Sequence, residues 1–268
     1  MTHISIQDRA EIIDALAREA GIIALGHFES LSTVSVESKG HLDLVTAADQ
    51  DVERFLTERL MKAFPDDGIF GEEGAAHEGT TGRTWVIDPI DGTFNFVRGG
   101  DQWAISIGLY ENGRPVFGVI HAPVRHQILV GGIGLRSTIN GTLMEKRSGM
   151  DLNRAACGVG FHPMIPVKLR LDTLRFVLDE ARMSFRCCGS ATLSLIEVAL
   201  GQVDGYIGMG ESTWDLMAAL PILEQLGIQS TVDWNGLDLS SKLHFACGTP
   251  EFLHAVAPIV PHGTTLEL

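Results

Sequence analysis

The spacing of hydrophobic and polar positions changes several times along the chain, and each change predicts a new element. Apolar side chains at helical spacing predict a helix over residues 5–27, with Ser5 as its N-cap. The polar residues that follow, 30–41, predict a loop. A second helix is predicted to begin at Thr46 and to end near residue 63, just before a proline.

Strand patterns dominate the next part of the chain. Ile69 and Phe70 predict a short strand, and the apolar run 85–87 predicts a buried one. Alternating apolar residues predict a strand over 103–109, which the hairpin signal Asn112-Gly113 ends. Three further runs predict an antiparallel meander: 116–122, 127–131 and 137–139.

The second half of the chain alternates between helix and strand patterns. Helices are predicted over residues 167–182, 191–200, 214–226 and from 250 onward, and strands over 185–188, 203–207, 229–232 and 243–247. Gly189-Ser190 is expected to open the second of these helices and Thr213 to cap the third. With no internal repeat and no long linker, we expect a single domain, 1–268, in which a boundary near 147–152 would separate lobes of 1–147 and 148–268.

Composition narrows the partners that this chain can have. It has 268 residues, 45% hydrophobic and 20% charged, and a net charge of −14. A net charge this negative disfavours the binding of nucleic acid. A phosphorylated metabolite can still bind where a metal supplies positive charge. No apolar run approaches the ~20 residues of a membrane span, and no signal peptide is evident. Four cysteines without a CxxC motif indicate reduced thiols and a cytoplasmic protein.

The most informative segment is residues 85–96, in which an apolar run leads into Asp-Pro-Ile-Asp-Gly-Thr. Asp88 and Asp91 would stand together at the end of a buried strand, where two acids repel and neither is easily desolvated. A bound cation with oxygen ligands resolves this conflict. Taken singly, each aspartate is about as well explained as an ordinary turn residue.

Three more acids occupy comparable positions. Asp49, Glu72 and Asp215 each lie where a strand ends or a helix begins, although each alone is better explained as a first-turn helix acid or a solvated turn residue. Two carboxylates ~4 Å apart repel by roughly 4 kcal/mol at an effective dielectric of 20, so gathering several requires one or two divalent ions. Oxygen ligands favour Mg²⁺ or Mn²⁺, and the absence of HExxH or of a Cys/His pair at ligand spacing disfavours zinc.

Gly92 and Thr93 add features suited to an anion. A glycine turn with free N–H groups can hold a phosphate, and the Thr93 hydroxyl can orient a water, although Thr93 can also simply cap a short helix. Motifs of other phosphate and acyl chemistries are missing: GxxxxGK[ST], GxGxxG and GxSxG.

Four sequence blocks together resemble the inositol monophosphatase family of Mg²⁺-dependent, lithium-sensitive phosphatases. They are DLVTAAD at 43–49, GEEG at 71–74, residues 85–96, and WDLMAA at 214–219, in the order and spacing of that family. The resemblance implies an α+β fold, a five-layer αβαβα sandwich, and commonly a homodimer.

The resemblance also implies roles for individual residues. Glu72, Asp88, Asp91, Asp215 and the carbonyl of Ile90 would ligate two Mg²⁺ ions. Glu72 and Thr93 would orient the attacking water, with Asp49 supporting Thr93, and Asp91 with the N–H groups of Gly92 and Thr93 would hold the phosphate. Gly189, Ser190 and Ala191 match the start of the helix that contacts the polyol.

The chain departs from the family where the alcohol is recognised. Gly208 stands where members active on inositol phosphate usually carry an acid, Glu211 lies nearby in a different register, and Arg98 to Asp101 replace the usual proline. The resemblance still makes inositol monophosphate the default substrate, with histidinol phosphate or a sugar or nucleotide phosphate as the alternative. A non-enzymatic regulatory protein is a further alternative, which the complete set of acids disfavours.

Overall fold

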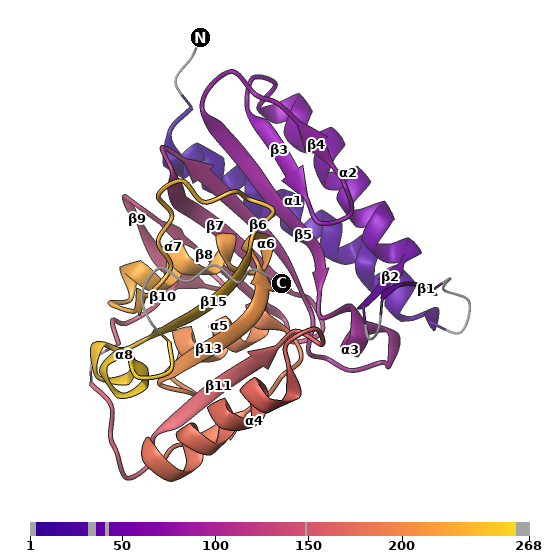
Figure 1. Ribbon diagram of the computed structural model, residues 1–268. Helices are drawn as coiled ribbons and strands as arrows, with labels where there is room; N and C mark the ends of the chain where they lie inside the picture. Colours follow the sequence, from indigo (N-terminus) through magenta and orange to yellow (C-terminus); the bar gives the residue numbers. More distant parts are fainter. Residues whose placement is uncertain (1–3, 32–35, 41–42, 148, 261–268) are drawn as a thin grey trace.

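Two β-sheets and three layers of helices alternate through the molecule. The structure is a computed structural model and describes residues 4–31, 36–40, 43–147 and 149–260. One sheet has eight strands in the order β10-β9-β8-β7-β6-β5-β3-β4 and the other has five in the order β12-β11-β13-β15-β14. Helices cover the outer faces of both sheets and fill the space between them (Figure 1), which confirms the predicted αβαβα sandwich.

The eight-stranded sheet and its helices come from the first half of the chain. The elements in order are α1 (Ile6–Phe28), β1 (Val36–Gly40), β2 (Asp43–Thr46), α2 (Ala47–Ala63), β3 (Gly68–Gly71), β4 (Ala76–His77), β5 (Arg83–Asp91), α3 (Thr93–Val97), β6 (Ala104–Glu111), β7 (Arg114–Ala122), β8 (Gln127–Gly132), β9 (Leu135–Ile139) and β10 (Thr142–Leu143). The two N-terminal helices and the antiparallel meander lie as the sequence predicted. Asn112 and Gly113 both have positive φ, 52° and 81°, as the hairpin signal requires.

The second half supplies the smaller sheet and the remaining helices. In order they are β11 (Ala156–Phe161), α4 (Val167–Arg175), a π-helical turn (Phe176–Glu180), β12 (Ser184–Arg186), α5 (Ala191–Leu200), β13 (Gly205–Ser212), α6 (Thr213–Met217), α7 (Ala219–Gln225), β14 (Gln229–Ser230), β15 (Lys242–Gly248) and α8 (Pro250–Val256). β11 pairs in parallel with β12 and β13, whereas β15 is antiparallel to its neighbours.

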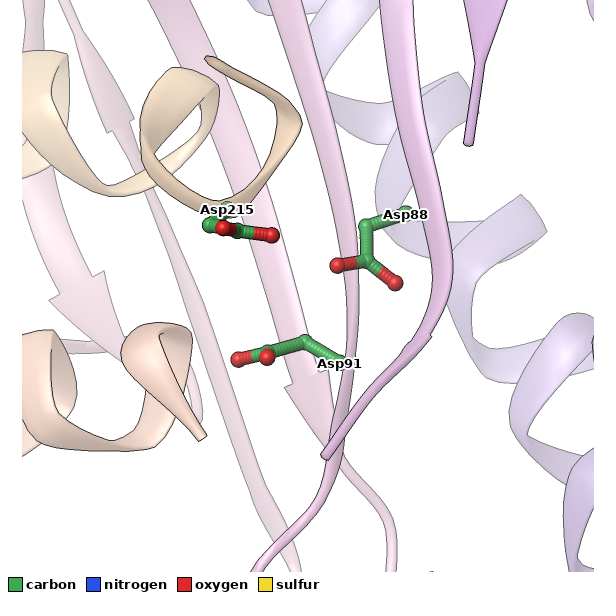
Figure 2. Close-up of side chains that lie close together, drawn as sticks. All are labelled: Asp88, Asp91 and Asp215. Carbon is green, nitrogen blue, oxygen red and sulfur yellow. The ribbon is translucent and has the colours of Figure 1, made fainter. Parts of the chain in front are cut away.

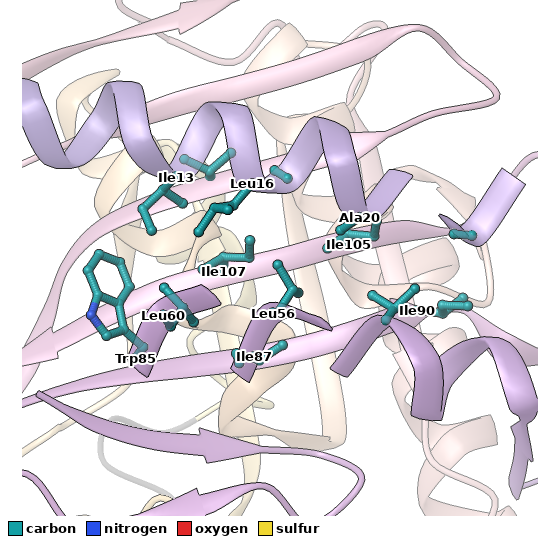
Figure 3. Packing of buried hydrophobic residues seen from close by; sticks show 14 of the residues in the cluster. Ile13, Leu16, Ala20, Leu56, Leu60, Trp85, Ile87, Ile90, Ile105 and Ile107 are labelled. Atoms are coloured by element: carbon teal, nitrogen blue, oxygen red, sulfur yellow. The ribbon is translucent and has the colours of Figure 1, made fainter. Parts of the chain in front are cut away.

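The core under the N-terminal helices fixes the sheet that carries the acids. Ile13 and Leu16 of α1 and Leu56 of α2 pack against Ile87 of β5 and Ile107 of β6 (Figure 3). These side chains are buried, and burying such a residue contributes ~1.5–3 kcal/mol each. The strand that delivers the acids is therefore held rigidly by its apolar face.

Several predicted elements are corrected by the structure. The loop predicted over 30–41 contains β1, which pairs with β2 as a hairpin beside the start of α2; the remaining positions 32–35 and 41 lie outside the described residues. β11 was not predicted at all, because glycines interrupt its apolar pattern. The strand predicted over 185–188 is Ser184–Arg186, so it ends before the two adjacent cysteines.

Helix ends account for the other corrections. Ser212 rather than Thr213 is the N-cap of α6, since the Asp215 side chain completes a capping box with Ser212. The helix predicted over 214–226 is two helices that meet at Ala218, and that predicted over 167–182 ends in a π-helical turn. All four cysteines are free thiols, as predicted. Among the helices that the structure describes, none is long and apolar enough to cross a membrane.

Candidate metal and phosphate site

β5 carries both acids of the central motif. The sequence suggested a turn at residues 88–91, but the strand continues through them to Asp91. Asp88 lies opposite Ser106 of β6 and Asp91 opposite Ala104, so a β-bulge adds one residue to β5 between them. Residues three apart on a regular strand face opposite sides of a sheet. The bulge therefore brings both carboxylates to the same side, and Pro89, which lacks an N–H, suits the interruption.

Asp215 joins these two acids from the first turn of α6. The Ser212 N–H donates a 2.6 Å hydrogen bond to Asp215 Oδ2, which fixes the carboxylate at the start of the helix. Ligand oxygens of Asp88, Asp91 and Asp215 all lie within 4.8 Å of one another. Figure 2 shows the three side chains converging from β5 and α6 on a common space.

The electrostatics of this cluster are unfavourable without a cation. Burial raises the pKa of Asp88 well above its ordinary value, and the charges of Glu72, Asp91 and Asp215 raise it further. Burial likewise raises the pKa of Asp91 and of Asp215. Asp88 Oδ1 is buried and has no hydrogen-bond partner among the described residues. Converging oxygens with this unmet demand for positive charge fit a hard divalent cation.

Glu72 reaches the cluster from β3. β3 runs parallel to β5 with Gly71 opposite Ile87, which puts the next residues, Glu72 and Asp88, side by side. The Glu72 N–H donates to the Ile87 carbonyl at 3.2 Å. The Glu72 carboxylate is close enough to Asp88 to be among the causes of its raised pKa.

Asp49 and Thr93 meet on the other side of the motif. The Thr93 hydroxyl lies 3.2 Å from Asp49 Oδ1 and 3.0 Å from the carbonyl oxygen of Ile90. The second oxygen of Asp49 accepts the Thr46 hydroxyl at 2.6 Å and its N–H at 2.8 Å, which completes the predicted capping box of α2. Burial raises the pKa of Asp49, and the hydrogen bonds from Thr46 partly oppose that rise.

Gly92 makes the turn from β5 into α3 possible. Its φ of 92° lies in the left-handed region, and a Cβ there would stand 2.6 Å from the Gln102 carbonyl oxygen. The chain can therefore reverse at once after Asp91, leaving Thr93 as the first residue of α3.

The start of α5 contacts the cluster through Asp91. Ser190, the N-cap of α5, donates its hydroxyl to Asp91 Oδ2 at 2.6 Å, and the Thr192 N–H donates to the same oxygen at 2.6 Å. Ala191 adds a backbone hydrogen bond to Asp91, and Gly189 adopts a φ of 71° just before the cap. Of the predicted substrate-contact residues 189–191, Ser190 and Ala191 are thus tied directly to the acid cluster.

The segment at 98–101 lies apart from this network. Asp101 forms an ion pair with Arg125 at 3.2 Å, and the Arg98 guanidinium lies over the Phe94 ring, 5.5 Å from its centre. Both side chains therefore have partners within the chain that are not members of the acid cluster.

Glu211 lies close enough to the cluster for its charge to raise the pKa of Asp215, in space left free by Gly160 and Gly208. The Tyr206 hydroxyl donates to Glu211 Oε1 at 2.5 Å, and burial raises the pKa of Glu211 to about 7. A Cβ at Gly208 would stand 2.7 Å from Glu211 Cγ, so the Glu211 side chain occupies space that a side chain at 208 would need.

Sequence reasoning missed two residues with contacts in this region. Thr192 was not singled out, although it follows Ser190 in the first turn of a helix where N–H groups are available to an acid. Glu53, buried on α2, was also missed, because an acid within a helix resembles a solvated one; its spacing of four from Asp49 was the available signal.

The chain belongs to the inositol monophosphatase family, whose model matches residues 6–261. It is 34% identical to the Nus factor SuhB of Xylella fastidiosa, over 83% of this chain and 80% of that protein. It is 30% identical to the fructose-1,6-bisphosphatase/inositol-1-monophosphatase of Thermotoga maritima, over 87% and 88% of the two chains.

Solved structures agree with this assignment. The extragenic suppressor protein SuhB of Bartonella henselae superposes with a TM-score of 0.85 at 26% identity, covering 95% of this chain and 98% of that one. An inositol monophosphatase from Thermotoga maritima superposes with a TM-score of 0.79 at 29% identity, covering 94% and 98%.

Proposed function

We propose that the protein is a Mg²⁺-dependent phosphatase of small phosphate monoesters, with inositol monophosphate as its preferred substrate. The observation that carries the proposal is the convergence of Asp88, Asp91 and Asp215 within 4.8 Å beside the Asp49–Thr93 contact. Acids whose negative charges are not balanced can bind a metal ion. A hydroxyl held by a buried carboxylate, as Thr93 is by Asp49, can position a water molecule. Family membership supports the same chemistry.

The proposed metal ligands are Glu72, Asp88, Asp91, Asp215 and the Ile90 carbonyl. Bound there, Mg²⁺ ions would supply positive charge for the attacking water, the phosphate and the departing alkoxide. No covalent phosphoenzyme is required, since one in-line displacement by water suffices.

The protein's own groups orient the water. Glu72 accepts a hydrogen bond from the water, and Thr93 fixes its direction through the hydroxyl oxygen. Asp49 holds Thr93 by accepting its hydroxyl hydrogen. The N–H groups at Gly92 and Thr93 bind phosphate oxygens, as backbone donors at the first turn of a helix can.

Recognition of the alcohol falls to the start of α5 and to the Tyr206–Glu211 pair. Ser190 and Ala191 bind Asp91 of the cluster, Gly189 directly precedes them, and Glu211 provides the carboxylate that Gly208 does not. A carboxylate accepts hydrogen bonds from sugar or polyol hydroxyls, which favours inositol and sugar esters. It also accepts from an ammonium group, which keeps histidinol phosphate as the alternative.

Steady-state kinetics on a panel of phosphate esters with Mg²⁺ tests this proposal. The panel contains inositol monophosphate, fructose 1,6-bisphosphate, histidinol phosphate, a nucleoside monophosphate and phenyl phosphate. We expect the highest kcat/KM for inositol monophosphate and inhibition by lithium. A clear preference for histidinol phosphate would make that compound the substrate in place of inositol monophosphate. If the protein hydrolysed none of these esters, the proposed phosphatase activity would be refuted.

The Glu211→Gln variant sharpens the same experiment. Loss of a hydrogen-bond acceptor for a substrate hydroxyl costs ~0.5–1.5 kcal/mol, so the preference for inositol monophosphate over phenyl phosphate should fall by up to about tenfold. An unchanged preference would remove Glu211 from the alcohol site.

A regulatory role is the second candidate, because several relatives are named Nus factor SuhB. It predicts a partner-binding function that survives loss of catalysis. The net charge of −14 favours a protein partner over direct contact with nucleic acid.

We further propose that the protein is a homodimer, which light scattering coupled to gel filtration would test.

A further inference from the structure

We propose that Glu53 is a positioning residue, which holds the turn that carries Glu72 and so sets the direction of the Glu72 carboxylate. This inference rests on the proposed function, since Glu72 is assigned there to the metal and the water. Glu53 lies on α2 and is only 5% exposed. Its two oxygens accept separate backbone hydrogen bonds, Oε2 from the Glu73 N–H at 2.8 Å and Oε1 from the Ala75 N–H at 2.9 Å.

These bonds act directly next to Glu72. The Glu72 N–H is held by the Ile87 carbonyl of β5 at 3.2 Å, and the following N–H, that of Glu73, is held by Glu53. The peptide groups on both sides of Glu72 are therefore fixed, one to the sheet and one to α2. A side chain on a backbone fixed at both ends has few orientations left, and the parallel register directs this one toward Asp88.

Gly71 shows that the approach of Glu53 is built into the fold. A Cβ at Gly71 would collide with Glu53 Oε2. The φ of Gly71 is not positive, so the glycine meets a demand for space rather than for an unusual backbone conformation. The Glu53 carboxylate fills the space where a side chain would otherwise stand.

α2 supports the other water-orienting residue in the same way. Asp49 is one helical turn before Glu53, so both acids project from the same face of α2. Asp49 contacts the Thr93 hydroxyl, while Glu53 holds the turn of Glu72. One helix, anchored in the core by buried residues such as Leu56, thus sets the positions of Thr93 and Glu72 relative to each other.

The test compares Glu53→Gln with two matched variants of the full chain. Gln keeps the size of the side chain but presents an NH₂ group to one of the two N–H donors. Glu58→Gln makes the same change at an exposed position of α2, and Asp67→Asn neutralises another buried acid at a distance from the cluster. The readouts are Mn²⁺ affinity by calorimetry, kcat with Mg²⁺, amide exchange at Glu73 and Ala75, and unfolding in urea.

For Glu53→Gln we expect Mn²⁺ affinity and kcat each to fall ~10–100-fold, the usual effect of removing a group that orients a metal ligand. Amide exchange at Glu73 and Ala75 should accelerate even without metal. Glu58→Gln should match the wild type in every readout. Asp67→Asn should lose stability yet keep its Mn²⁺ affinity, which separates positioning from a general loss of stability.

Wild-type Mn²⁺ affinity and kcat in folded Glu53→Gln would overturn the inference. If that variant does not fold, Gly71→Ala displaces the same carboxylate from the other side and should give the same losses, while Glu53→Asp, which keeps both acceptor oxygens, should recover part of them. A wild-type protein that binds Mn²⁺ but hydrolyses no ester refutes the proposed function and still leaves the affinity comparison to decide on Glu53. A wild-type protein that binds no Mn²⁺ overturns both.

Discussion

Two buried aspartates of the eight-stranded sheet differ in the charges around them. One lies at the beginning of the neighbouring parallel strands β3 and β5, and the other lies toward their ends. Asp67, just before β3, is 3% exposed and pairs with Arg9 at 3.2 Å and Arg83 at 2.8 Å. It also accepts hydrogen bonds from the Thr81 hydroxyl and the indole N–H of Trp85. Asp88, on β5, is 1% exposed, and its charged neighbours are acids.

The pKa values of these two groups express the difference. Burial alone would raise both. At Asp67 the hydrogen bonds from Arg83, Thr81 and Arg9, together with the charge of Arg83, outweigh burial and hold the pKa below its ordinary value. At Asp88 the charges of Glu72, Asp91 and Asp215 add to the effect of burial, and the pKa is raised. A buried acid with its own cations serves stability, whereas a buried acid among acids is suited to bind something that the chain does not supply.

Asp88→Asn should give the largest effect, a loss of activity without a loss of stability. Removing a ligand from the proposed metal site should lower kcat with Mg²⁺ at least ~1,000-fold, about 4 kcal/mol of transition-state stabilisation. The free energy of unfolding without metal should stay equal or rise, because a mutually repelling charge is lost. Kinetics and urea unfolding check both parts, and retained turnover would remove Asp88 from the metal site.

Asp67→Asn should give the opposite pattern. It leaves Arg9 and Arg83 facing a neutral amide in a mostly buried position, which should lower the free energy of unfolding by about 3 kcal/mol. Turnover by the folded protein should change little. If kcat fell as far as in Asp88→Asn with stability intact, the division between a structural and a functional acid would be wrong.

The stabilisation of the folded state by Mg²⁺ should also distinguish Asp67 from Asp88, with a slightly smaller change in free energy. A ligand at 100 times its dissociation constant stabilises the folded state by about 2.7 kcal/mol. We expect that gain for the wild type and for Asp67→Asn, and its loss in Asp88→Asn. Thermal unfolding with and without Mg²⁺ measures it, and an equal gain in all three proteins would mean that the metal binds elsewhere.

Local signals in the sequence predicted much of this arrangement. Ser5 and Thr46 cap α1 and α2 as their spacing suggests, because a cap depends on residues only three positions apart. The five acids were recognised as a group because each ends a strand or begins a helix. The structure brings Asp88, Asp91 and Asp215 within 4.8 Å.

What the sequence did not predict depends on contacts between distant segments. The bulge between Asp88 and Asp91 is set by pairing with β6, so the sequence suggested a turn where the strand in fact continues. β11 is an interior strand because β12 and β13 flank it, although its own apolar pattern is broken by glycine. Likewise nothing local shows that Asp67 is paired with cations, since the arginines that pair with it come from α1 and β5.

The pH dependence of stability should show the smallest effect, and its sign should differ between the two acids. The pKa of Asp67 is lowered from 3.8, so its contribution is complete above that pH and is lost as the pH falls below it. The pKa of Asp88 is raised from 3.8, so the folded state without metal keeps a proton that the unfolded state releases, and stability falls as the pH rises above about 4. Each unit of pKa shift corresponds to about 1.4 kcal/mol.

Urea unfolding of metal-free protein between pH 3 and pH 8 measures both contributions by difference. The stability gap between wild type and Asp67→Asn should narrow below pH 4. The gap between wild type and Asp88→Asn should instead open as the pH rises, with the variant becoming the more stable protein, and saturating Mg²⁺ should close or reverse it. Parallel pH profiles for all three proteins would show that the surroundings of the two aspartates do not control their protonation, and the contrast between the two ends of the sheet would then fail.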